Sequence, residues 1–485
     1  MNLKIYNTQT RRLEPFTTLQ PGIVTMYCCG VTVYDYCHLG HARSYINWDM
    51  VRRYLQWRGY EVTYVQNFTD IDDKILKRAQ QEGVSMADIS ERFIEAYFAD
   101  IRPLNIMDAD EYPRVTDNIS GIQQLIKILL EKNYAYAVDG DVYFHVEAFD
   151  EYGKLSGRSQ SQMQAGASGR VAVKNAKTVK KHPSDFALWK SAKPEEPAWD
   201  SPWGKGRPGW HIECSAMVRA LLGETIDIHG GGGDLVFPHH ENEIAQSEAA
   251  NGKPLAKYWL HNGMVTVNGE KMSKSLGNFT TIRELLNRPL DPMVIRLFVL
   301  QAHYRKPLDF TEEAISSATN GWQTLQQGLL FGEKYGNKLG WQKNQELDST
   351  VIEQFKAAMD DDFNSPGGLA VLFELAKNLR REGNLLTHEG KTSVDLEELQ
   401  RQWQTLVQLA GVLGLEAKSE ANLEDTHSFD EAEIQKLIQQ RNEARKVKNY
   451  AQSDRIREQL QQKGITLIDR PNGETSILQR MKWQK

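Results

Sequence analysis

The sequence predicts an α/β fold in which a parallel sheet is followed by an α-helical bundle and a small C-terminal module. The first observation is a strand–helix–strand pattern over residues 23–65, the spacing of a βαβ unit, which favours parallel strands. The second is a change of character from about residue 312 onward, where long helical runs alternate with polar breaks. A chain of 485 residues is also too long for one hydrophobic core, so we expect two to four domains.

The composition is that of an ordinary globular protein. Apolar residues make up 40% and charged residues 25% of the chain, and a net charge of −6 gives no bulk indication of nucleic-acid binding, so any such surface must be local. With four cysteines, a disulfide framework is not expected. The first residues contain no apolar signal core, and no run approaches the roughly 18 apolar residues of a membrane span. We expect a cytoplasmic protein without membrane contact, with thiols free for a metal.

The βαβ unit consists of an apolar strand at 23–29, a helix at 42–56 and an alternating strand at 61–65. Ligands of parallel sheets bind beyond the carboxyl ends of the strands. The loop that follows the first strand and the acidic segment 67–74 are therefore expected at one edge of the sheet. For the acidic segment, helix capping with solvated charge and a role in an active site are both open.

An insertion is predicted at residues 112–205, where helical patterns give way to a hairpin and then to a stretch rich in Gly, Ser, Gln and Lys. The parallel pattern resumes with a helix over 210–222 and a buried strand over 225–229. The run Gly230–Gly233 follows that strand, and a further helix opens at Pro238. The sheet domain is thus predicted to consist of two halves.

Two histidines, His38 and His41, stand at the start of the first helix with Gly40 between them. A helix N-terminus offers free N–H groups and the positive end of a dipole to a phosphate, and Gly40 allows a close approach of the backbone. Residues three apart share a helix face, so both imidazoles can reach one ligand and stabilise charge that develops on an α-phosphate. A capping pair or a metal-binding pair is the alternative.

A lysine loop, Lys271-Met272-Ser273-Lys274-Ser275, follows the turn residues Asn268-Gly269. Lys271 and Lys274 could close on a leaving pyrophosphate, whereas an isolated segment of this kind is usually a solvated run of charge. Joined to an upstream His-x-Gly-His loop on a βαβ unit, the pattern resembles the class I aminoacyl-tRNA synthetases at both loops and in the same order.

Four residues of metal-binding type are spread over the sheet domain: Cys29, Cys214, His239 and Glu243. They contain no Cys-x-x-Cys pair, which excludes a zinc finger or ribbon. His239 and Glu243 lie at i, i+4 on one helix face, as in other helical zinc sites. Cys29 ends one strand and Cys214 lies on a helix entering the neighbouring one, so folding could bring them together. His240 is a rival ligand, although it points about 100° away, and each cysteine could instead be a small buried apolar residue.

Several of these stretches together are similar to the cysteinyl-tRNA synthetase family, and the resemblance covers essentially the whole chain. The stretches are residues 209–217, 227–232, 237–243 and 271–275. The resemblance implies a Rossmann-like catalytic domain in which the four candidate ligands hold one active-site Zn²⁺. It implies that Trp210, His229 and Asp234 surround the amino acid. It also implies an ATP site that comprises Gly40, His41, Gly231, Gly232 and Lys274.

The resemblance also implies a division of the chain. Residues 1–111 and 206–262 form the catalytic domain, 112–205 the connective insertion, 263–311 the stem region of the lysine loop, 312–414 the helical bundle and 430–485 an anticodon-binding module. Within that module, residues 441–457 carry six basic residues against two acidic ones, which fits phosphate contact with tRNA. A solvated amphipathic helix is an equal alternative.

The predicted activity is activation of L-cysteine by Mg²⁺-ATP, with His38, His41, Lys271 and Lys274 as the catalytic residues, followed by transfer to the 3′ end of tRNA(Cys). We expect a monomer. A pocket of ordinary side chains separates cysteine from serine poorly, whereas zinc coordinates and deprotonates a thiol far more readily than a hydroxyl. Two alternatives are a cysteine ligase acting on an amino sugar (the mycothiol-pathway relative), which has a shorter C-terminus, and a non-catalytic tRNA- or zinc-binding paralogue.

Overall fold

The computed structural model describes residues 3–158, 180–193, 196–273, 276–341 and 346–418, isolated positions between 437 and 456, and two strands near the C-terminus. The chain forms two compact units, residues 1–416 and 417–485. Within the described ranges, no helix is long and apolar enough to cross a membrane.

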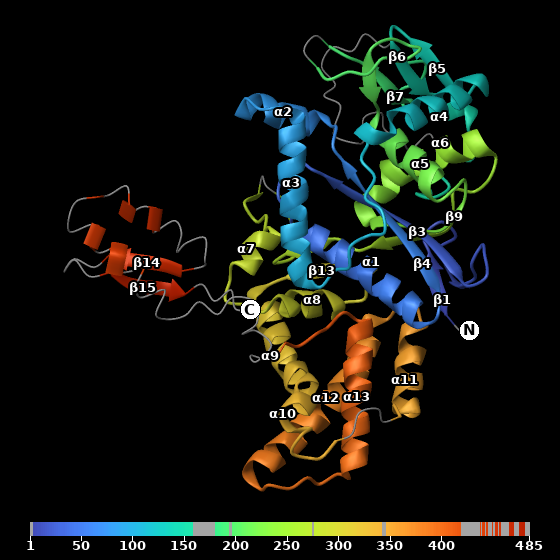
Figure 1. Cartoon of the computed structure of the whole chain (residues 1–485). Helices are drawn as coiled ribbons and strands as arrows, with labels where there is room; N and C mark the ends of the chain where they lie inside the picture. Colours follow the sequence, from blue (N-terminus) through green and yellow to red (C-terminus); the bar gives the residue numbers. More distant parts are fainter. Residues whose placement is uncertain are drawn as a thin grey trace. The chain divides into compact units, whose positions relative to one another are not determined.

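A four-stranded parallel sheet forms the centre of the first unit, with the strand order β10-β9-β3-β4 (Figure 1). Its first half is β3 (Ile23–Thr32), α1 (Leu39–Trp57) and β4 (Glu61–Thr69), which is the predicted βαβ unit. Both strands are buried along most of their length, as is usual for parallel strands covered on both faces. The predicted α/β fold class is confirmed.

The second half of the sheet is β9 (Ile226–Gly232), α6 (Glu241–Asn251) and β10 (Ala256–Asn262). β9 pairs with β3, and from these two central strands the chain continues to opposite edges of the sheet. The carboxyl ends of β3 and β9 therefore flank the switch point at which sheets of this kind bind ligands.

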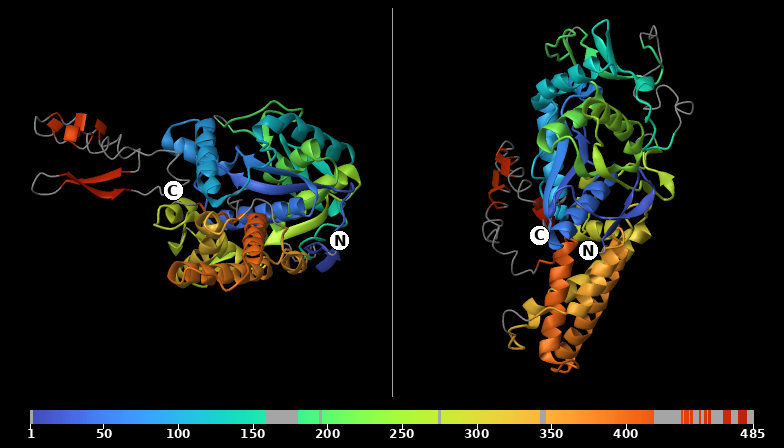
Figure 2. Two further views of the ribbon diagram at one scale, coloured as in Figure 1. Left: turned by 60° about the horizontal axis from the view of Figure 1, so that its bottom comes forward. Right: turned by 90° about the vertical axis from the view of Figure 1, so that its right-hand side faces the viewer.

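Helices cover both faces of the sheet (Figures 1 and 2). α5 (Trp210–Leu221) and α6 pack together with α4 (Ile119–Glu131). α1 packs against α8 (Pro292–Leu300) and α13 (Leu396–Val412). The second set joins the sheet to the helical region that follows.

The buried guanidinium of Arg296 holds that junction together. Its Nε donates to the carbonyl oxygen of Leu413 at 2.7 Å, its Nη1 donates to that of Leu104 at 3.0 Å, and its Nη2 pairs with Asp49 of α1. One side chain of α8 thus connects α1 with the end of α13. Burial lowers the pKa of Arg296, and the Asp49 carboxylate opposes that effect.

The insertion contains α4 and an antiparallel sheet with the order β5-β6-β7-β8. Its strands are β5 (Ala135–Val138), β6 (Asp141–Phe144), β7 (Phe186–Ser191) and β8 (Gly206–Pro208). The sheet extends to Pro208, three residues beyond the predicted boundary at 205. α4 packs on α5 and α6, so the insertion shares a hydrophobic core with the sheet domain.

The acidic segment after β4 leads into α2 (Asp73–Glu82) and α3 (Met86–Ile101). Asp72 caps α2, accepting a hydrogen bond from the backbone N–H of Lys74 at 2.8 Å. The capping role considered for this segment is therefore present.

The lysine loop leaves a small sheet formed by β11 (Val265–Val267), β12 (Glu270–Lys271) and β13 (Leu308–Phe310). β11 and β12 form a hairpin whose turn residues, Asn268 and Gly269, both have positive φ angles, 51° and 78°. The chain then enters the short helix α7 (Ile282–Leu286), which Thr281 and Glu284 cap.

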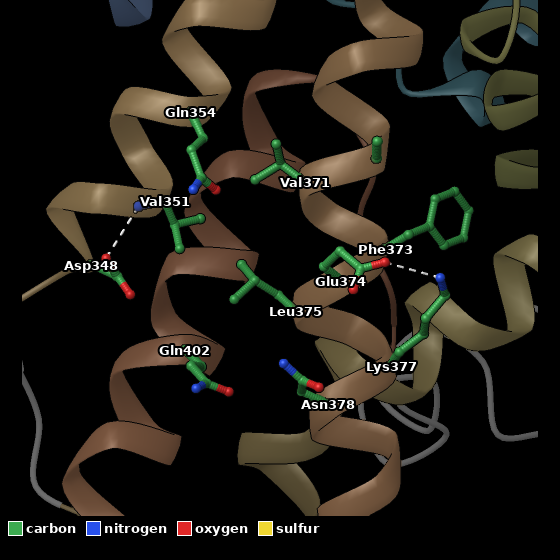
Figure 3. A pocket seen from close by; sticks show the side chains of 11 residues that line it. Asp348, Val351, Gln354, Val371, Phe373, Glu374, Leu375, Lys377, Asn378 and Gln402 are labelled. Carbon is green, nitrogen blue, oxygen red and sulfur yellow. Dashed lines mark hydrogen bonds and ion pairs between the residues drawn. The ribbon is translucent and has the colours of Figure 1, made fainter.

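The region from 312 to 412 is a helical bundle (Figure 2). It contains α9 (Glu312–Leu329), α10 (Phe331–Tyr335), α11 (Ser349–Met359), α12 (Ser365–His388) and α13. A depression of about 720 Å³ lies among α11, α12 and α13, lined by mixed apolar and polar side chains such as Val371, Leu375 and Asn378 (Figure 3).

In the second unit, β14 (Ile465–Asp469) and β15 (Thr475–Arg480) form an antiparallel pair.

Candidate active site

A pocket of about 370 Å³ opens beyond the carboxyl ends of β3 and β9 and contains most of the predicted site residues. Those that line it are Cys29, His38, Gly40, His41, Trp210, Cys214, Gly231, Gly232, Asp234 and His239. The acidic segment contributes Asn67, Thr69 and Lys74. His229, Glu243 and Lys271 do not line this pocket, and Lys274 lies outside the described residues.

His38 and His41 cap α1 and face the pocket at the same time. The Nδ1 atom of His38 accepts a hydrogen bond from the N–H of Gly40 at 3.0 Å, and Nδ1 of His41 accepts from the N–H of His38 at 3.1 Å. Because each Nδ1 is an acceptor, the ring proton of each imidazole must be on Nε2. The capping alternative is thus correct and does not compete with phosphate binding, since capping leaves both rings with an N–H donor at the other nitrogen.

The two rings are close and electrically neutral donors. Their centroids are 3.8 Å apart. Burial lowers the pKa of His41 well below its usual value, and His38 and the charge of Lys74 lower it further. His41 therefore contributes an oriented dipole rather than a positive charge at neutral pH.

Gly40 makes this arrangement possible. A Cβ atom at position 40 would lie 2.7 Å from Cε1 of His38, too close for real Cβ contacts. The glycine lets the His38 ring fold back over the first turn of α1. A glycine at position 40 therefore allows close approach of the His38 ring as well as of a phosphate.

The end of the lysine loop is fastened to the histidine loop. The N–H of Leu39 donates to the carbonyl oxygen of Thr280 at 3.0 Å, and the N–H of Ile282 donates to that of Cys37 at 2.9 Å. The Phe279 ring lies 5.1 Å from the His38 ring. The two signature loops are thus adjacent in space, although more than 200 residues apart in the chain. Lys271 is exposed in β12.

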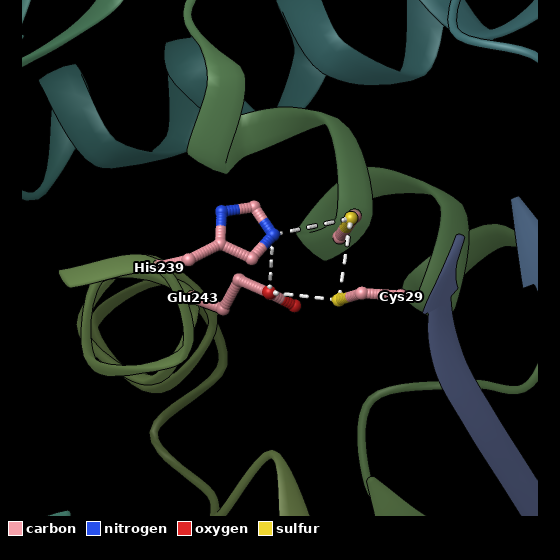
Figure 4. A group of neighbouring side chains, drawn as sticks. Cys29, His239 and Glu243 are labelled. Carbon is pink, nitrogen blue, oxygen red and sulfur yellow. Dashed lines mark hydrogen bonds and ion pairs between the residues drawn. The ribbon is translucent and has the colours of Figure 1, made fainter. Parts of the chain in front are cut away.

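The four predicted metal ligands converge on one point (Figure 4). Cys29 Sγ lies 3.8 Å from Cys214 Sγ, and Cys214 Sγ lies 3.6 Å from His239 Nε2. Glu243 Oε1 lies 3.0 Å from His239 Nε2 and 3.5 Å from Cys29 Sγ. Zn–S bonds of about 2.3 Å and Zn–N bonds of about 2.0 Å in a tetrahedral site would separate two sulfurs by about 3.8 Å and sulfur from nitrogen by about 3.5 Å. The residues fit a zinc ion.

A second group of possible ligands shares two of these residues and comprises Cys29, His229, His240 and Glu243. His240 Nε2 lies 3.3 Å from Cys29 Sγ, so the rival ligand considered from the sequence is close to the site. Two observations favour the first group: it brings two thiols, which zinc binds well, and three of its members line the pocket. Of the second group, only Cys29 lines it.

His240 and His229 contact ligands of the first group, which are Cys29 and Glu243 respectively. Nδ1 of His240 lies 2.8 Å from His261 Nε2, and Nδ1 of His261 lies 2.8 Å from the hydroxyl of Thr8. His229 Nε2 lies 2.9 Å from Glu243 Oε2, on the oxygen not directed at His239. The contacts of His240, His261 and Thr8 were missed in the sequence, since no periodic or motif signal connects residue 8 with residue 261.

Electrostatics prepares the cluster for a cation. Burial raises the pKa of the Cys29 thiol well above its usual value, and Cys214 and Glu243 raise it further. A hydrogen bond from Cys29 lowers the pKa of Cys214 to about 6. Burial opposes the protonation of His239, yet the Glu243 carboxylate and Cys214 raise its pKa to about 9. Against burial, His229 and His239 hold the pKa of Glu243 well below its usual value. In the metal-free protein, protonated His239 therefore supplies the positive charge that Glu243 and Cys214 attract.

The three residues predicted to surround the amino-acid substrate, Trp210, His229 and Asp234, differ in their positions relative to the pocket. The Trp210 ring stacks on His239, with centroids 4.1 Å apart, and Asp234 is exposed at the pocket. His229 is completely buried, and its ring stacks on Trp259. Its Nε2 atom contacts Glu243, and His229 does not line the pocket in this structure, so its proximity to the amino acid stays a prediction.

The fold and this site define a class I aminoacyl-tRNA synthetase. The family model described as "tRNA synthetases class I (C) catalytic domain" matches residues 15–320, and a DALR domain model matches residues 354–418. Among solved structures, a Mycobacterium tuberculosis methionyl-tRNA synthetase in complex with methionyl-adenylate has the same fold. The TM-score is 0.53 at 16% identity, over 81% of this chain and 89% of that one.

Curated relatives narrow the class. A cysteine–tRNA ligase of Nostoc sp. is 66% identical over 480 residues, and one of Trichormus variabilis is 67% identical over 480 residues. Each match covers 98% of this chain and 99% of the relative. The chain belongs to the cysteine–tRNA ligase family. An amino acid, ATP and a tRNA are therefore its substrates, and neither alternative from the sequence, the amino-sugar ligase or the non-catalytic paralogue, is supported.

Proposed function

We propose that the pocket activates L-cysteine with ATP and passes the cysteinyl group to the 3′ end of tRNA(Cys), with residues of the two signature loops and a zinc ion performing the steps. The observation that carries this proposal is that the capped histidines His38 and His41 and the ligands Cys29, Cys214 and His239 line one pocket of about 370 Å³.

The zinc ion is proposed to be held by Cys29, Cys214, His239 and Glu243, whose donor set and spacing suit it. When bound, zinc would coordinate the thiolate of cysteine in preference to the hydroxyl of serine. His229 orients Glu243 through the hydrogen bond to its second oxygen. Trp210, stacked on His239, forms an apolar wall, and Asp234 offers a carboxylate to the ammonium group of the amino acid.

For activation, the cysteine carboxylate attacks the α-phosphate of ATP, which enters as its magnesium complex. The Nε2–H groups of His38 and His41 donate to the oxygens on which charge develops. Gly40, Gly231 and Gly232 allow the nucleotide to approach the backbone. Lys271 and Lys274 stabilise the leaving pyrophosphate. Metal-free chemistry at phosphorus would leave most of the triphosphate charge uncompensated, so the magnesium complex is the expected substrate form.

The remainder of the chain is proposed to recognise tRNA. The catalytic domain would comprise 1–111 and 206–262, with 112–205 as connective insertion and 263–311 as the stem of the lysine loop. The bundle at 312–414, which contains most of the DALR match, and a module at 430–485 would bind the anticodon side. We further propose a monomer that acts in the cytoplasm. All four cysteines are free, which agrees with a reducing compartment.

Cysteine-dependent exchange of pyrophosphate into ATP, followed by charging of total tRNA, tests this function. We expect both activities with cysteine and neither with serine. Exchange without charging would contradict the tRNA step, and exchange with serine at a comparable rate would contradict selection of the thiol. Metal analysis of the purified protein, expected to give about one zinc per chain, tests the metal independently of activity. A molar mass of two chains in solution would contradict the monomer.

A further inference from the structure

We infer that Lys74 binds the phosphodiester that links the 3′-terminal nucleotide of the tRNA, and so guides the acceptor end into the pocket. This inference rests on the proposed transfer to tRNA. It starts from the charge of the pocket: among the described residues that line it, Lys74 is the only lysine or arginine. The two histidines that line the same pocket are neutral donors, as their hydrogen bonds require.

The first turn of α2 aims Lys74 at the pocket. Its backbone N–H is held by the cap residue Asp72, and its Nζ lies 4.8 Å from the centre of the Tyr34 ring. One helical turn further along the same face, Arg78 donates to the carbonyl oxygen of Tyr34 at 2.8 Å and pairs with Asp35 at 3.0 Å. The loop that carries Tyr34 is therefore fastened to α2, and Lys74 is confined to the gap between this loop and the pocket.

The positive charge of Lys74 is available to a ligand. Within the described parts of the chain, Lys74 forms no ion pair, and its side chain is exposed. Its neighbour Asp73 is already paired, with Arg207 and, at 3.5 Å, with Lys190, both from the antiparallel sheet of the insertion. Arg207 also faces Glu196 at 3.6 Å. The carboxylates of Asp73 and Glu196 thus balance Lys190 and Arg207, and neither of them pairs with Lys74.

The position of Lys74 favours tRNA over ATP as the source of the phosphate. The histidine loop meets the segments that flank the lysine loop, where Phe279 packs on His38 and Met272 approaches Gly40. We assign the triphosphate to this junction of the two signature loops, as in the proposed function. Lys74 is an exposed lining residue in the first turn of α2, where its neighbour Asp73 pairs with Lys190 and Arg207 of the insertion. We expect the tRNA hydroxyl to enter from the exposed side on which Lys74 lies, and the phosphodiester next to that hydroxyl is the first anionic group to follow.

The test compares Lys74→Ala with Lys77→Ala, an exposed lysine on the same helix that does not line the pocket. For Lys74→Ala we expect pyrophosphate exchange within about twofold of the unmodified protein and a rise of about tenfold in the KM for tRNA, the loss of one charge-assisted contact. Lys74→Arg should restore most of the tRNA affinity. Lys77→Ala should leave both reactions unchanged.

A tRNA carrying an uncharged methylphosphonate at its last phosphodiester identifies the partner atom. With this tRNA, the KM of the unmodified protein should rise about as much as the KM of Lys74→Ala rises with natural tRNA. The KM of Lys74→Ala should not rise further with the modified tRNA. An equal fall in exchange and charging would assign Lys74 to ATP and overturn the inference, and so would additive losses with the modified tRNA. Failure of the unmodified protein to exchange or charge would instead contradict the proposed function.

Discussion

Cys29 Sγ lies 3.8 Å from Cys214 Sγ, although 185 residues separate the two cysteines in the chain. Cys29 lies within β3, where it lines the pocket, and Cys214 lies within α5. The distance is too long for a disulfide and equals the separation expected for two thiolates on one tetrahedral zinc ion, about 3.8 Å. Four predictions follow from this contact and from the packing around it.

Cys214 and His240 distinguish the two possible ligand groups, because each belongs to only one of them. We expect Cys214→Ser to weaken zinc binding by more than about 100-fold, since even partners outside the coordination shell are worth about 10- to 100-fold. His240→Gln should cost about tenfold at most. Zinc content after dialysis against a chelator of known affinity measures both. The reverse order would assign the metal to the second group. Cys37→Ser, a buried cysteine that belongs to neither ligand group, is the control.

Zinc affinity should rise with pH between about 7 and 9. Burial raises the pKa of Cys29 well above its usual range, and Glu243 helps to raise that of His239 to about 9, so both carry protons near neutral pH. Zinc must displace these protons, and raising the pH removes the competition. In the metal-free protein, the raised pKa of His239 means stability that is complete below about 6.5 and lost as pH passes about 9. Proton release on zinc addition, measured with an indicator dye, checks the first claim, and a pH-independent affinity would contradict it.

Gly40→Ala should slow cysteine activation by about 100-fold without unfolding the protein. The added Cβ would meet the His38 ring at 2.7 Å, so the ring and its Nε2–H donor must move away from the phosphate. Pyrophosphate exchange measures the loss. Gly121→Ala in α4, where nothing lies within 4 Å of the added atom, should have no effect. Normal exchange in Gly40→Ala would show that the position of His38 does not matter for activation.

Arg296→Met should destabilise the first unit by about 3–5 kcal/mol. The substitution removes a buried cation that pairs with Asp49 and satisfies the carbonyl oxygens of Leu104 and Leu413. Urea unfolding followed by tryptophan fluorescence measures the change. Arg380→Met, at an exposed position on α12, should change stability by less than about 0.5 kcal/mol. A loss below about 1 kcal/mol for Arg296→Met would mean that Arg53, which also pairs with Asp49, compensates.

Local patterns in the sequence determined much of this protein. The apolar run 23–29 and the helical period after it predicted β3 and α1, because burial and period act within one element. The spacing of His239 and Glu243 placed both on one helix face for the same reason. The histidine and lysine loops indicated the class of enzyme, since each is a contiguous segment.

Only the tertiary structure decided which elements became neighbours. Nothing in the period of either strand pairs β3 with β9, yet this pairing brings Cys29 to the ligands of the second half. The fold also pairs His229 with Glu243, because a completely buried imidazole needs a hydrogen-bond partner inside the protein. Lys74 lies at the pocket beside Tyr34, whose loop is bound to α2 by the hydrogen bond from Arg78. Such contacts join segments far apart in the chain, and their geometry follows from packing rather than from local spacing.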